Sequence, residues 1–269
     1  MTETRIHPGA VVEAGAQLGA GVIVGPFCHV GPHVILADGV ELKSHVVIAG
    51  NTRIGARTRV FPFASLGHEP QDLKYRGEEN SLIIGADCLI REGVTMNPGT
   101  TANAGRTVVG DKCAFLANSH VAHDCVVGNG VIFSNNVMLA GHCTIGNHVI
   151  VGGGAGIHQF CRIGDNAFVG GLSGVENDVI PFGMTIGNRA KLGGLNLVGM
   201  KRAGIGRDSI HNARRAFRQL FSGGKPLQEA AGTLDNELAS DPVVGKILAF
   251  IRQGGDRAFC TPGRAPRGE

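Results

Sequence analysis

Aromatic residues and long apolar runs are scarce in this chain of 269 residues. It has no tryptophan and a single tyrosine, so a folded core must be built mainly from aliphatic side chains. No stretch approaches about 18 consecutive apolar residues, and the N-terminus lacks the apolar segment of a signal peptide. These absences predict a protein that is neither secreted nor stably inserted in a membrane.

The sequence also lacks the closely spaced cysteine pairs of metal sites. The seven cysteines include no Cys-x-x-Cys, the spacing typical of zinc sites. Cysteines in this arrangement fit a reducing compartment, and we therefore expect a cytoplasmic protein. Six of them occupy one recurring position of the repeat described next, alternating there with other small residues. This pattern predicts small buried side chains, not metal ligands or nucleophiles.

The chain does have a period of six. Every sixth residue from Ile6 to Leu66 is aliphatic, and after interruptions near 68–81 and 98–107 the period continues to Val175. A period of six fits neither an α-helix nor the simple alternation of a strand. It is typical of a parallel β-helix in which three six-residue units form one coil. About 26 units predict roughly nine coils, whose stacking creates the core.

The pattern changes in the C-terminal part, where apolar residues recur at helical spacing from about residue 207. We expect a mainly β protein with a parallel β-helix over 1–188, a small helical domain over 189–259 and a disordered tail over 260–269. Residues 189–269 hold 14 Lys or Arg against 7 Asp or Glu. This basic balance favours an acidic partner, whether a protein, a phosphate or a nucleic acid.

Histidines gather on one predicted face of the β-helix. His123, His142 and His158 fall on coils that follow one another every 18 residues, so stacking places them close together. His120 lies just before this face. Histidine is the natural general base near neutral pH, and Asp124 is placed to orient one ring. The cluster predicts a catalytic site.

Two other classes of protein are compatible with parts of this pattern. His120, His123 and His142 have the right chemistry to bind zinc, as in the carbonic anhydrases that share this architecture. A purely structural or ice-binding β-helix would instead repeat threonine or charged residues along one flat face. The local histidine cluster and the irregular loop around Asp72 and Lys74 argue against that second alternative.

The six-residue repeat resembles the left-handed β-helix of the hexapeptide-repeat acyltransferases. Individual segments are similar to the family of UDP-N-acetylglucosamine O-acyltransferases, which begin lipid A synthesis. These segments are Gln71–Tyr75, Asn118–Cys125 (Asn-Ser-His-Val-Ala-His-Asp-Cys), Leu139–His142, Ile157–Cys161, Val169–Gly174 and Asn196–Arg202.

The resemblance implies a reaction and its catalytic residues. A homotrimer would transfer a 3-hydroxyacyl chain from acyl carrier protein to the 3-hydroxyl of UDP-N-acetylglucosamine, without a cofactor, a metal or a nucleic acid. His123 would be the general base and Asp124 would polarise it. The backbone N–H of Gly141 would stabilise the oxyanion, and His142 would contact the substrate.

The resemblance also implies binding residues. Gly171 matches the position that limits the acyl chain length in the family. Arg214, Arg215 and Arg218 are candidates for docking the acidic carrier protein. The other residues implied to bind substrate are Gln71, Asp72, Lys74, His120, His158, Gln159, Asn196 and Arg202.

Two departures affect the expected nucleotide contacts. Ala203 stands where the family often has a second arginine, and Val198 where some members have an acidic residue. The later N-acyltransferase of the same pathway is the alternative within the fold, but that family has an additional N-terminal uridine-binding domain. The sequence decides neither the preferred acyl chain length nor whether the acceptor sugar carries a 3-hydroxyl or a 3-amino group.

Overall fold

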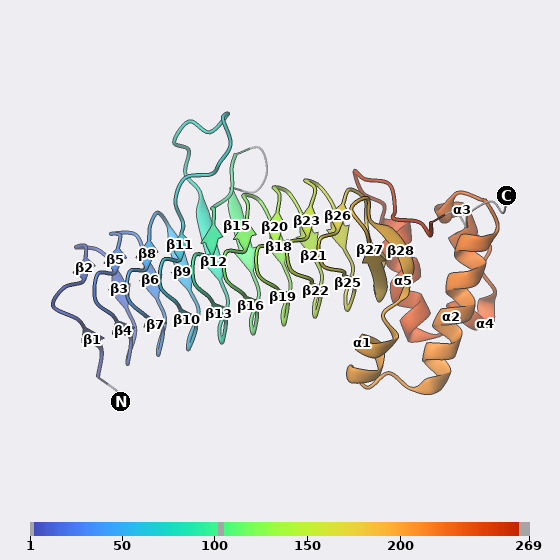
Figure 1. Cartoon of the computed structure of the whole chain (residues 1–269), viewed down its shortest axis with the longest axis horizontal. Coiled ribbons are helices and arrows are strands. Elements are labelled where there is room, and N and C mark those ends of the chain that lie inside the picture. Colours follow the sequence, from blue (N-terminus) through green and yellow to red (C-terminus); the bar gives the residue numbers. More distant parts are fainter. Residues whose placement is uncertain (1–2, 102–104, 264–269) are drawn as a thin grey trace.

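The computed structural model describes residues 3–101 and 105–263. They form a long prism of short strands with a group of helices at its C-terminal end (Figure 1). This arrangement confirms the predicted fold class, a mainly β chain built as a parallel β-helix and followed by helices. Strands β1 to β26 each occupy one six-residue unit, in agreement with the number of units read from the sequence.

Each coil contributes one strand to each of three sheets, and all pairs are parallel except β27 with β28. The first sheet contains β1 (Arg5–Ile6), β4 (Ile23–Val24), β7 (Glu41–Leu42), β10 (Arg59–Val60), β13 (Leu89–Ile90), β16 (Ala114–Phe115), β19 (Ile132–Phe133), β22 (Ile150–Val151), β25 (Phe168–Val169), β27 (Gly183–Ile186) and β28 (Lys191–Leu195). The second contains β2 (Val11–Val12), β5 (His29–Val30), β8 (Val47–Ile48), β11 (Ser65–Leu66), β14 (Thr95–Met96), β17 (His120–Val121), β20 (Met138–Leu139), β23 (Gly156–Ile157) and β26 (Gly174–Val175). The third contains β3 (Gln17–Leu18), β6 (Ile35–Leu36), β9 (Thr52–Ile54), β12 (Ser81–Ile84), β15 (Arg106–Val109), β18 (Val126–Val127), β21 (Thr144–Ile145) and β24 (Arg162–Ile163).

The second residue of most strands points into the prism. Val121, Leu139 and Ile157 are paired across β17, β20 and β23 and are at most 2% exposed. Because the aliphatic residues stack in register along the prism, one continuous core runs through the coils. The first residue of the two-residue strands faces away from the core, which is how His120 reaches the outer surface of the second sheet.

The cysteines of the repeat are free and buried, as predicted. Their thiols donate to backbone carbonyls of the next coil, as Cys125 does to the oxygen of Ala140 at 3.2 Å. Burial raises the pKa of the Cys161 thiol to about 12. Such a thiol carries almost no thiolate near neutral pH and is a poor nucleophile.

The two interruptions of the repeat are loops inserted between coils. The first lies between β11 and β12 and projects from the prism (Figure 1), and the second lies between β14 and β15. Residues 102–104 of the second loop lie outside the described part of the chain. The side-chain amide of Asn97 donates to the carbonyls of His68 and Glu69 at 3.1 and 3.0 Å. This buried amide ties the base of the first loop to the start of the second.

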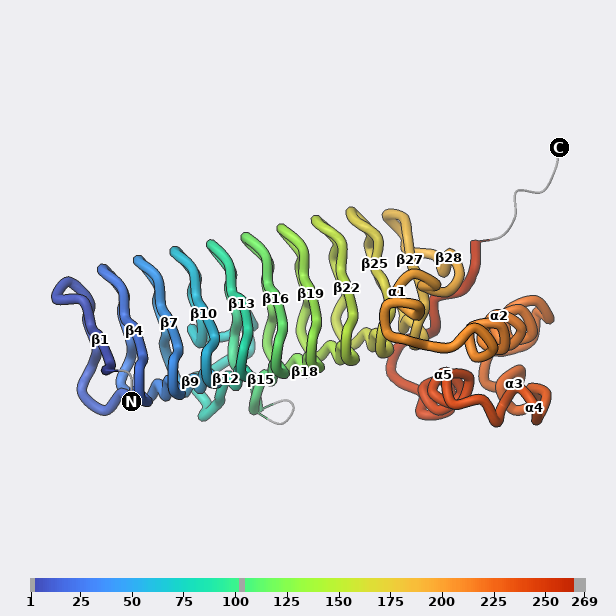
Figure 2. The backbone as a smooth tube through the Cα atoms, turned by 90° about the horizontal axis from the view of Figure 1, so that it is seen from below, coloured from blue at the N-terminus to red at the C-terminus, as the bar shows by residue number. Residues whose placement is uncertain are grey.

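The C-terminal part contains α1 (Leu197–Arg202), α2 (Arg207–Ser222), α3 (Leu227–Gly232), α4 (Asn236–Ala239) and α5 (Pro242–Gln253). Helix α1 lies against the last coils, whereas α2, α3 and α4 lie beyond them (Figure 2). Two details differ from the expected boundaries. The antiparallel strand β28 extends the first sheet past residue 188. Cys260 is buried and hydrogen-bonded to Asp178, so the predicted tail does not begin at 260, whereas 264–269 lie outside the described residues. No described helix is long and apolar enough to cross a bilayer.

Candidate active site

A groove of about 760 Å³ runs along the outer face of the second sheet, from β14 to β26. It is bounded by the turn residue Asn118 on one side and by His123 and Gly141 on the other. Of the residues predicted from the sequence, the groove brings together Gln71, His120, His123, Gly141 and His158. His120, His123 and His158 thus line one groove, as the stacking predicted, whereas His142 lies outside the groove lining and packs beside His123.

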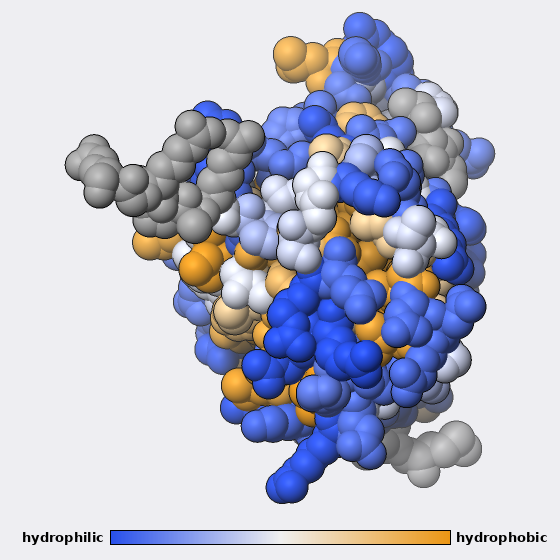
Figure 3. Space-filling view, turned by 90° about the vertical axis from the view of Figure 1, so that its right-hand side faces the viewer, coloured by the Kyte–Doolittle hydropathy of each residue, from blue (hydrophilic) through white to orange (hydrophobic). Residues whose placement is uncertain are grey.

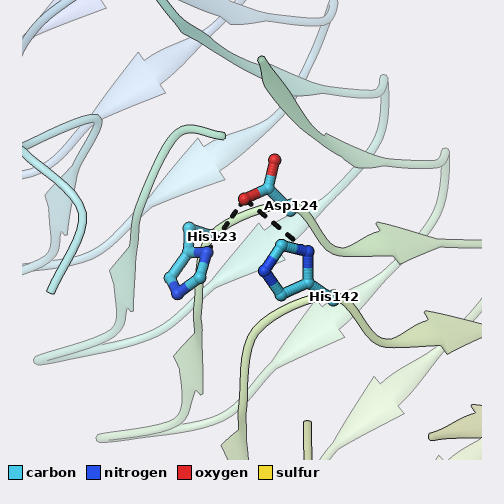
Figure 4. A group of neighbouring side chains, drawn as sticks. All are labelled: His123, Asp124 and His142. Carbon is cyan, nitrogen blue, oxygen red and sulfur yellow. Dashed lines mark hydrogen bonds and ion pairs between the residues drawn. The ribbon is translucent and has the colours of Figure 1, made fainter. Parts of the chain in front are cut away.

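His123 and Asp124 form the hydrogen-bonded pair at the edge of the groove. Nδ1 of His123 lies 2.9 Å from Oδ2 of Asp124, and the two side chains are 15% and 0% exposed (Figure 4). The carboxylate accepts a hydrogen bond from Nδ1–H. A neutral His123 therefore presents the lone pair of Nε2. This is the arrangement that a general base requires.

The second loop supplies the cap over Asp124. Thr100 donates its backbone N–H to Oδ1 at 2.9 Å and its hydroxyl to Oδ2 at 2.7 Å. These bonds compensate the carboxylate for its burial and fix its orientation. The sequence did not single out Thr100, because it lies in an insertion where the period of six gives no position.

His142 packs beside the pair on the next coil. Its ring meets that of His123 edge to face with centroids 5.0 Å apart, and it stacks on Phe160 at 4.6 Å with an interplanar angle of 4°. Its Nδ1 is 3.9 Å from Oδ2 of Asp124, beyond hydrogen-bond distance. Burial lowers the pKa of His142 despite the opposing effect of Asp124. Its imidazole is therefore neutral near pH 7.

His120 occupies the groove floor one strand residue before Val121. Its Nδ1 lies 2.7 Å from the hydroxyl of Thr95 on the preceding coil. Burial lowers the pKa of His120, and hydrogen bonding to the backbone of Thr95 opposes this only in part. His120 is thus a second neutral imidazole facing the groove.

Gly141 lies directly against the ring of His123. A Cβ at this position would come within 2.6 Å of Cε1 and 2.8 Å of Nε2, so any larger residue would displace the imidazole. None of the hydrogen bonds formed among the described residues uses the Gly141 N–H. A free backbone donor beside Nε2 is suited to hold a developing negative charge.

The three predicted residues of the first loop differ in whether they line the groove. Gln71 lines it, whereas Lys74 is exposed outside it. Asp72 accepts the N–H of Lys74 at 2.9 Å, which shapes the loop. The carboxylate of Asp72 is near enough to His142 to act on its pKa, in the upward direction.

Asn196 and Arg202 lie on a different face of the same chain. They line a second groove of about 780 Å³ between α1 and the outer face of β19, β22, β25 and β27. Val198 and Ala203 line it as well. The amide of Asn196 accepts the N–H of Gly199 at 2.9 Å and donates to the carbonyl of Asn166 at 3.0 Å. Asn196 is thus also the N-cap of α1, a role that the sequence motif does not predict.

Two further predicted residues lie towards the C-terminal end. His158 and Gln159 are exposed, and both contact Arg257, a residue that the sequence analysis missed. Gly171 lies after β25, at the turn that leads to β26, and is not part of the groove lining. Its Cβ would approach the carbonyl oxygen of Gly153 to 3.3 Å.

The predicted set of zinc ligands is not the set whose donor atoms converge. In the described part of the chain, atoms within 4.8 Å of one another belong to His123, Asp124 and His142, while His120 is engaged with Thr95. Nδ1 of His123 and Oδ2 of Asp124 face each other at 2.9 Å. An ion between them would have to break that bond, so the geometry favours proton transfer over metal binding.

Comparison with known proteins identifies relatives along nearly the whole chain. Residues 178–260 match the family model described as "Udp N-acetylglucosamine O-acyltransferase; Domain 2", and residues 15–50 and 106–141 match the hexapeptide-repeat transferase model. The acyl-[acyl-carrier-protein]–UDP-N-acetylglucosamine O-acyltransferase of Methylobacterium radiotolerans is 62% identical over 99% of this chain and 98% of its own length. That of Brucella ovis is 52% identical over 97% and 94%.

Solved structures agree with the sequence relatives. LpxA of Acinetobacter baumannii superposes with a TM-score of 0.92 at 40% identity, covering 95% of this chain and 99% of its own. The UDP-N-acetylglucosamine acyltransferase of Campylobacter jejuni gives a TM-score of 0.91 at 37% identity, covering 96% and 100%. The chain therefore belongs to the UDP-N-acetylglucosamine O-acyltransferase family of hexapeptide-repeat proteins.

Proposed function

We propose that this enzyme transfers a 3-hydroxyacyl chain from acyl carrier protein to the 3-hydroxyl of UDP-N-acetylglucosamine, the first step of lipid A synthesis. The observation that carries the proposal is the His123–Asp124 pair capped by Thr100. It leaves Nε2 of His123 free at the edge of a groove and beside an unused backbone donor at Gly141.

The mechanism is general-base catalysis. Nε2 of His123 takes the proton of the sugar 3-hydroxyl while that oxygen attacks the thioester carbonyl carbon. Asp124 stabilises the imidazolium through the hydrogen bond with Nδ1. The N–H of Gly141 donates to the oxyanion of the tetrahedral intermediate. When the intermediate collapses, the carbon–sulfur bond breaks, and His123 returns its proton to the thiolate of the carrier protein.

His142 assists as a neutral imidazole. Its ring is held between the edge of His123 and the face of Phe160, so it cannot swing away from the reacting atoms. A neutral ring at this position adds no positive charge that would oppose protonation of His123. It contacts the substrate beside the oxyanion without acting as the base.

The predicted substrate contacts lie on two faces of one chain, which supports a homotrimer with its sites between copies. His120 and His158 line the groove on the second sheet, whereas Arg202 lines the groove beside α1 on the first sheet. A homotrimer in which the first groove of one copy faces the second groove of the next would unite them around one nucleotide sugar. Met138 and Ile132, exposed by 58% and 37%, are apolar residues of these two faces that such packing would cover.

Acyl carrier protein docks on the helical part. Arg214 and Arg218 are exposed on α2 and Arg215 is half-buried there, at an end of the molecule with a broad hydrophilic surface (Figure 3). A basic surface attracts an acidic carrier and speeds its encounter. The free, buried thiols suit the reducing conditions of the cytoplasm, where we place the reaction.

The test is an assay of the purified protein with UDP-N-acetylglucosamine, its 3-amino analogue and a series of 3-hydroxyacyl carrier proteins. We expect a 3-O-acylated sugar nucleotide as the main product, insensitive to a chelator. Exclusive use of the amino analogue would identify an N-acyltransferase instead. Carbon dioxide hydration that depends on bound zinc would identify the metal alternative.

A further inference from the structure

The chain after α5 returns from the helical part and crosses the last coils of the prism. The N–H of Asp178 donates to the carbonyl of Ala258 at 2.8 Å, and the N–H of Cys260 donates to the carbonyl of Asp178 at 2.7 Å. These two bonds fix the backbone on either side of Phe259. They place the segment 257–260 beside the coil that carries His158.

A buried ion pair strengthens this crossing. Nε of Arg162 donates to Oδ2 of Asp178 at 2.7 Å, and Asp178 is fully buried. The guanidinium of Arg162 also lies over the ring of Phe250 in α5, 4.4 Å from its centroid. A planar guanidinium held by a carboxylate and by an aromatic face has a defined orientation. The segment is therefore positioned by the β-helix as well as by α5.

Arg257 reaches from this segment to the C-terminal end of the groove. Its Nη2 lies 2.7 Å from Nδ1 of His158, and its Nε donates to the carbonyl of Gln159 at 3.0 Å. A guanidinium only donates, so Nδ1 of His158 must be the acceptor. Although this Nδ1 also lies 3.3 Å from the carbonyl of Gln159, a proton on it would face the Arg257 donor. A neutral His158 therefore carries its proton on Nε2.

We propose that Arg257 is a positioning residue that holds His158 in the groove with Nε2–H as a hydrogen-bond donor to the nucleotide sugar. His158 lines the groove, whereas Arg257 does not, so Arg257 acts through His158. This inference rests on the proposed function, because it assigns the donor to that acceptor substrate. Sugar hydroxyls and phosphates both offer oxygen acceptors that a fixed N–H recognises.

The fork of the guanidinium is essential to this role. Two of its nitrogens engage an imidazole and a carbonyl at the same time, which a single ammonium on a flexible stem does not reproduce. Arg257→Lys keeps the charge but loses the two-point hold. Arg252→Ala is the matched control, because Arg252 is an exposed arginine in the last turn of α5, near Arg257 in the chain.

Steady-state kinetics test the inference with Arg257→Ala, Arg257→Lys, His158→Ala and the double alanine variant. We expect Arg257→Ala to raise KM for the nucleotide sugar about tenfold while kcat stays within about twofold. Arg257→Lys should behave like Arg257→Ala, and Arg252→Ala like the wild type. The double variant should be no worse than His158→Ala, because the two residues act as one unit. Additive losses, or an unchanged KM, would overturn the inference.

A spectroscopic readout separates this inference from the proposed function. In protein with ¹⁵N-labelled histidine, His158 should show the Nε2–H tautomer, and Arg257→Ala should replace it by a mixture of tautomers. This measurement needs no turnover. A changed tautomer in a protein that does not acylate UDP-N-acetylglucosamine would refute the proposed function and the assigned ligand while keeping the positioning role. An unchanged tautomer in folded Arg257→Ala would refute the positioning role whatever the activity.

Discussion

Two columns of stacked side chains run along different edges of the same prism. An exposed column of Phe27, His45 and Phe63 lies between the first and second sheets, with ring centroids 4.9 and 5.2 Å apart. A buried column of Asp124, His142 and Phe160 lies between the second and third sheets, with His142 and Phe160 stacked at 4.6 Å. All six residues have a left-handed φ between 56° and 66°, because each occupies the same turn of its six-residue unit.

The surroundings of the columns differ, although the backbone does not. Phe27 and Phe63 are 65% and 67% exposed, whereas the side chains of His142 and Asp124 are 15% and 0% exposed. Only the buried column lies under an inserted loop, which brings Thr100 onto the carboxylate. The repeat thus provides a regular stack of side chains, and the insertion removes water from it. Chemistry at the edge between the second and third sheets depends on both the stacked side chains and the inserted loop.

The strongest test of this difference removes one histidine beside each column. We expect His123→Ala to lower kcat by about a thousandfold or more, because it removes the general base. His45→Ala, in the exposed column, should leave kcat unchanged. Steady-state acyl-transfer rates measure both effects, and circular dichroism and size-exclusion chromatography check that fold and assembly survive. Near-wild-type turnover by folded His123→Ala would remove His123 from the mechanism.

Asp124→Asn tests the carboxylate with little change in shape. The amide cannot stabilise an imidazolium at His123, so kcat should fall by about a hundredfold with a smaller change in KM. Thr100→Val should have a weaker effect of the same kind, because it deletes the hydroxyl bond but keeps the backbone bond to Oδ1. Equal kcat values for Asp124→Asn and the wild type would make Asp124 a structural residue only.

The regular part of this molecule was predictable from the sequence for a physical reason. A β-helix repeats one local environment many times, so every sixth position independently indicates an inward side chain. The same arithmetic brought His123 and His142 onto neighbouring coils, and it extends to Phe160, which follows His142 by 18 residues. The stacking of Phe160 on His142 could therefore also have been predicted from the sequence.

The irregular contacts were not predictable in this way. Thr100 belongs to an insertion, and Arg257 reaches His158 across 99 residues of chain. Asn196 combines a predicted substrate role with a helix cap, which a motif cannot distinguish from binding. Such contacts depend on how separate elements pack together. The boundary of the helical part and the start of the tail differed from expectation for the same reason.

Gly171→Met tests whether the edge between the first and second sheets, which carries the exposed column, also binds substrate. Backbone bonds link this edge from coil to coil as far as Leu172, the exposed neighbour of Gly171. If Gly171 leaves room for the end of the acyl chain, a methionine there should shift the ratio of kcat/KM towards shorter chains by about tenfold or more. Leu172→Met is the control and should keep the wild-type profile. An unchanged chain-length profile in Gly171→Met would reject this role.

The smallest expected effect concerns pH and stability. Burial lowers the pKa of His142 and His120, so the native state holds both rings neutral where an unfolded histidine, with a pKa of about 6.5, would bind a proton. Below about pH 6.5 the unfolded chain binds more protons, and stability must fall as the pH falls, by at most about 1.4 kcal/mol per pH unit for each ring.

His142→Phe keeps a ring on Phe160 and removes one titrating group. Urea unfolding between pH 5 and 8 should therefore show a shallower loss of stability in acid for His142→Phe than for the wild type. His45→Phe, in the exposed column, is the control and should keep the wild-type slope. Identical slopes for all three proteins would show that protonation of His142 does not lower the free energy of unfolding.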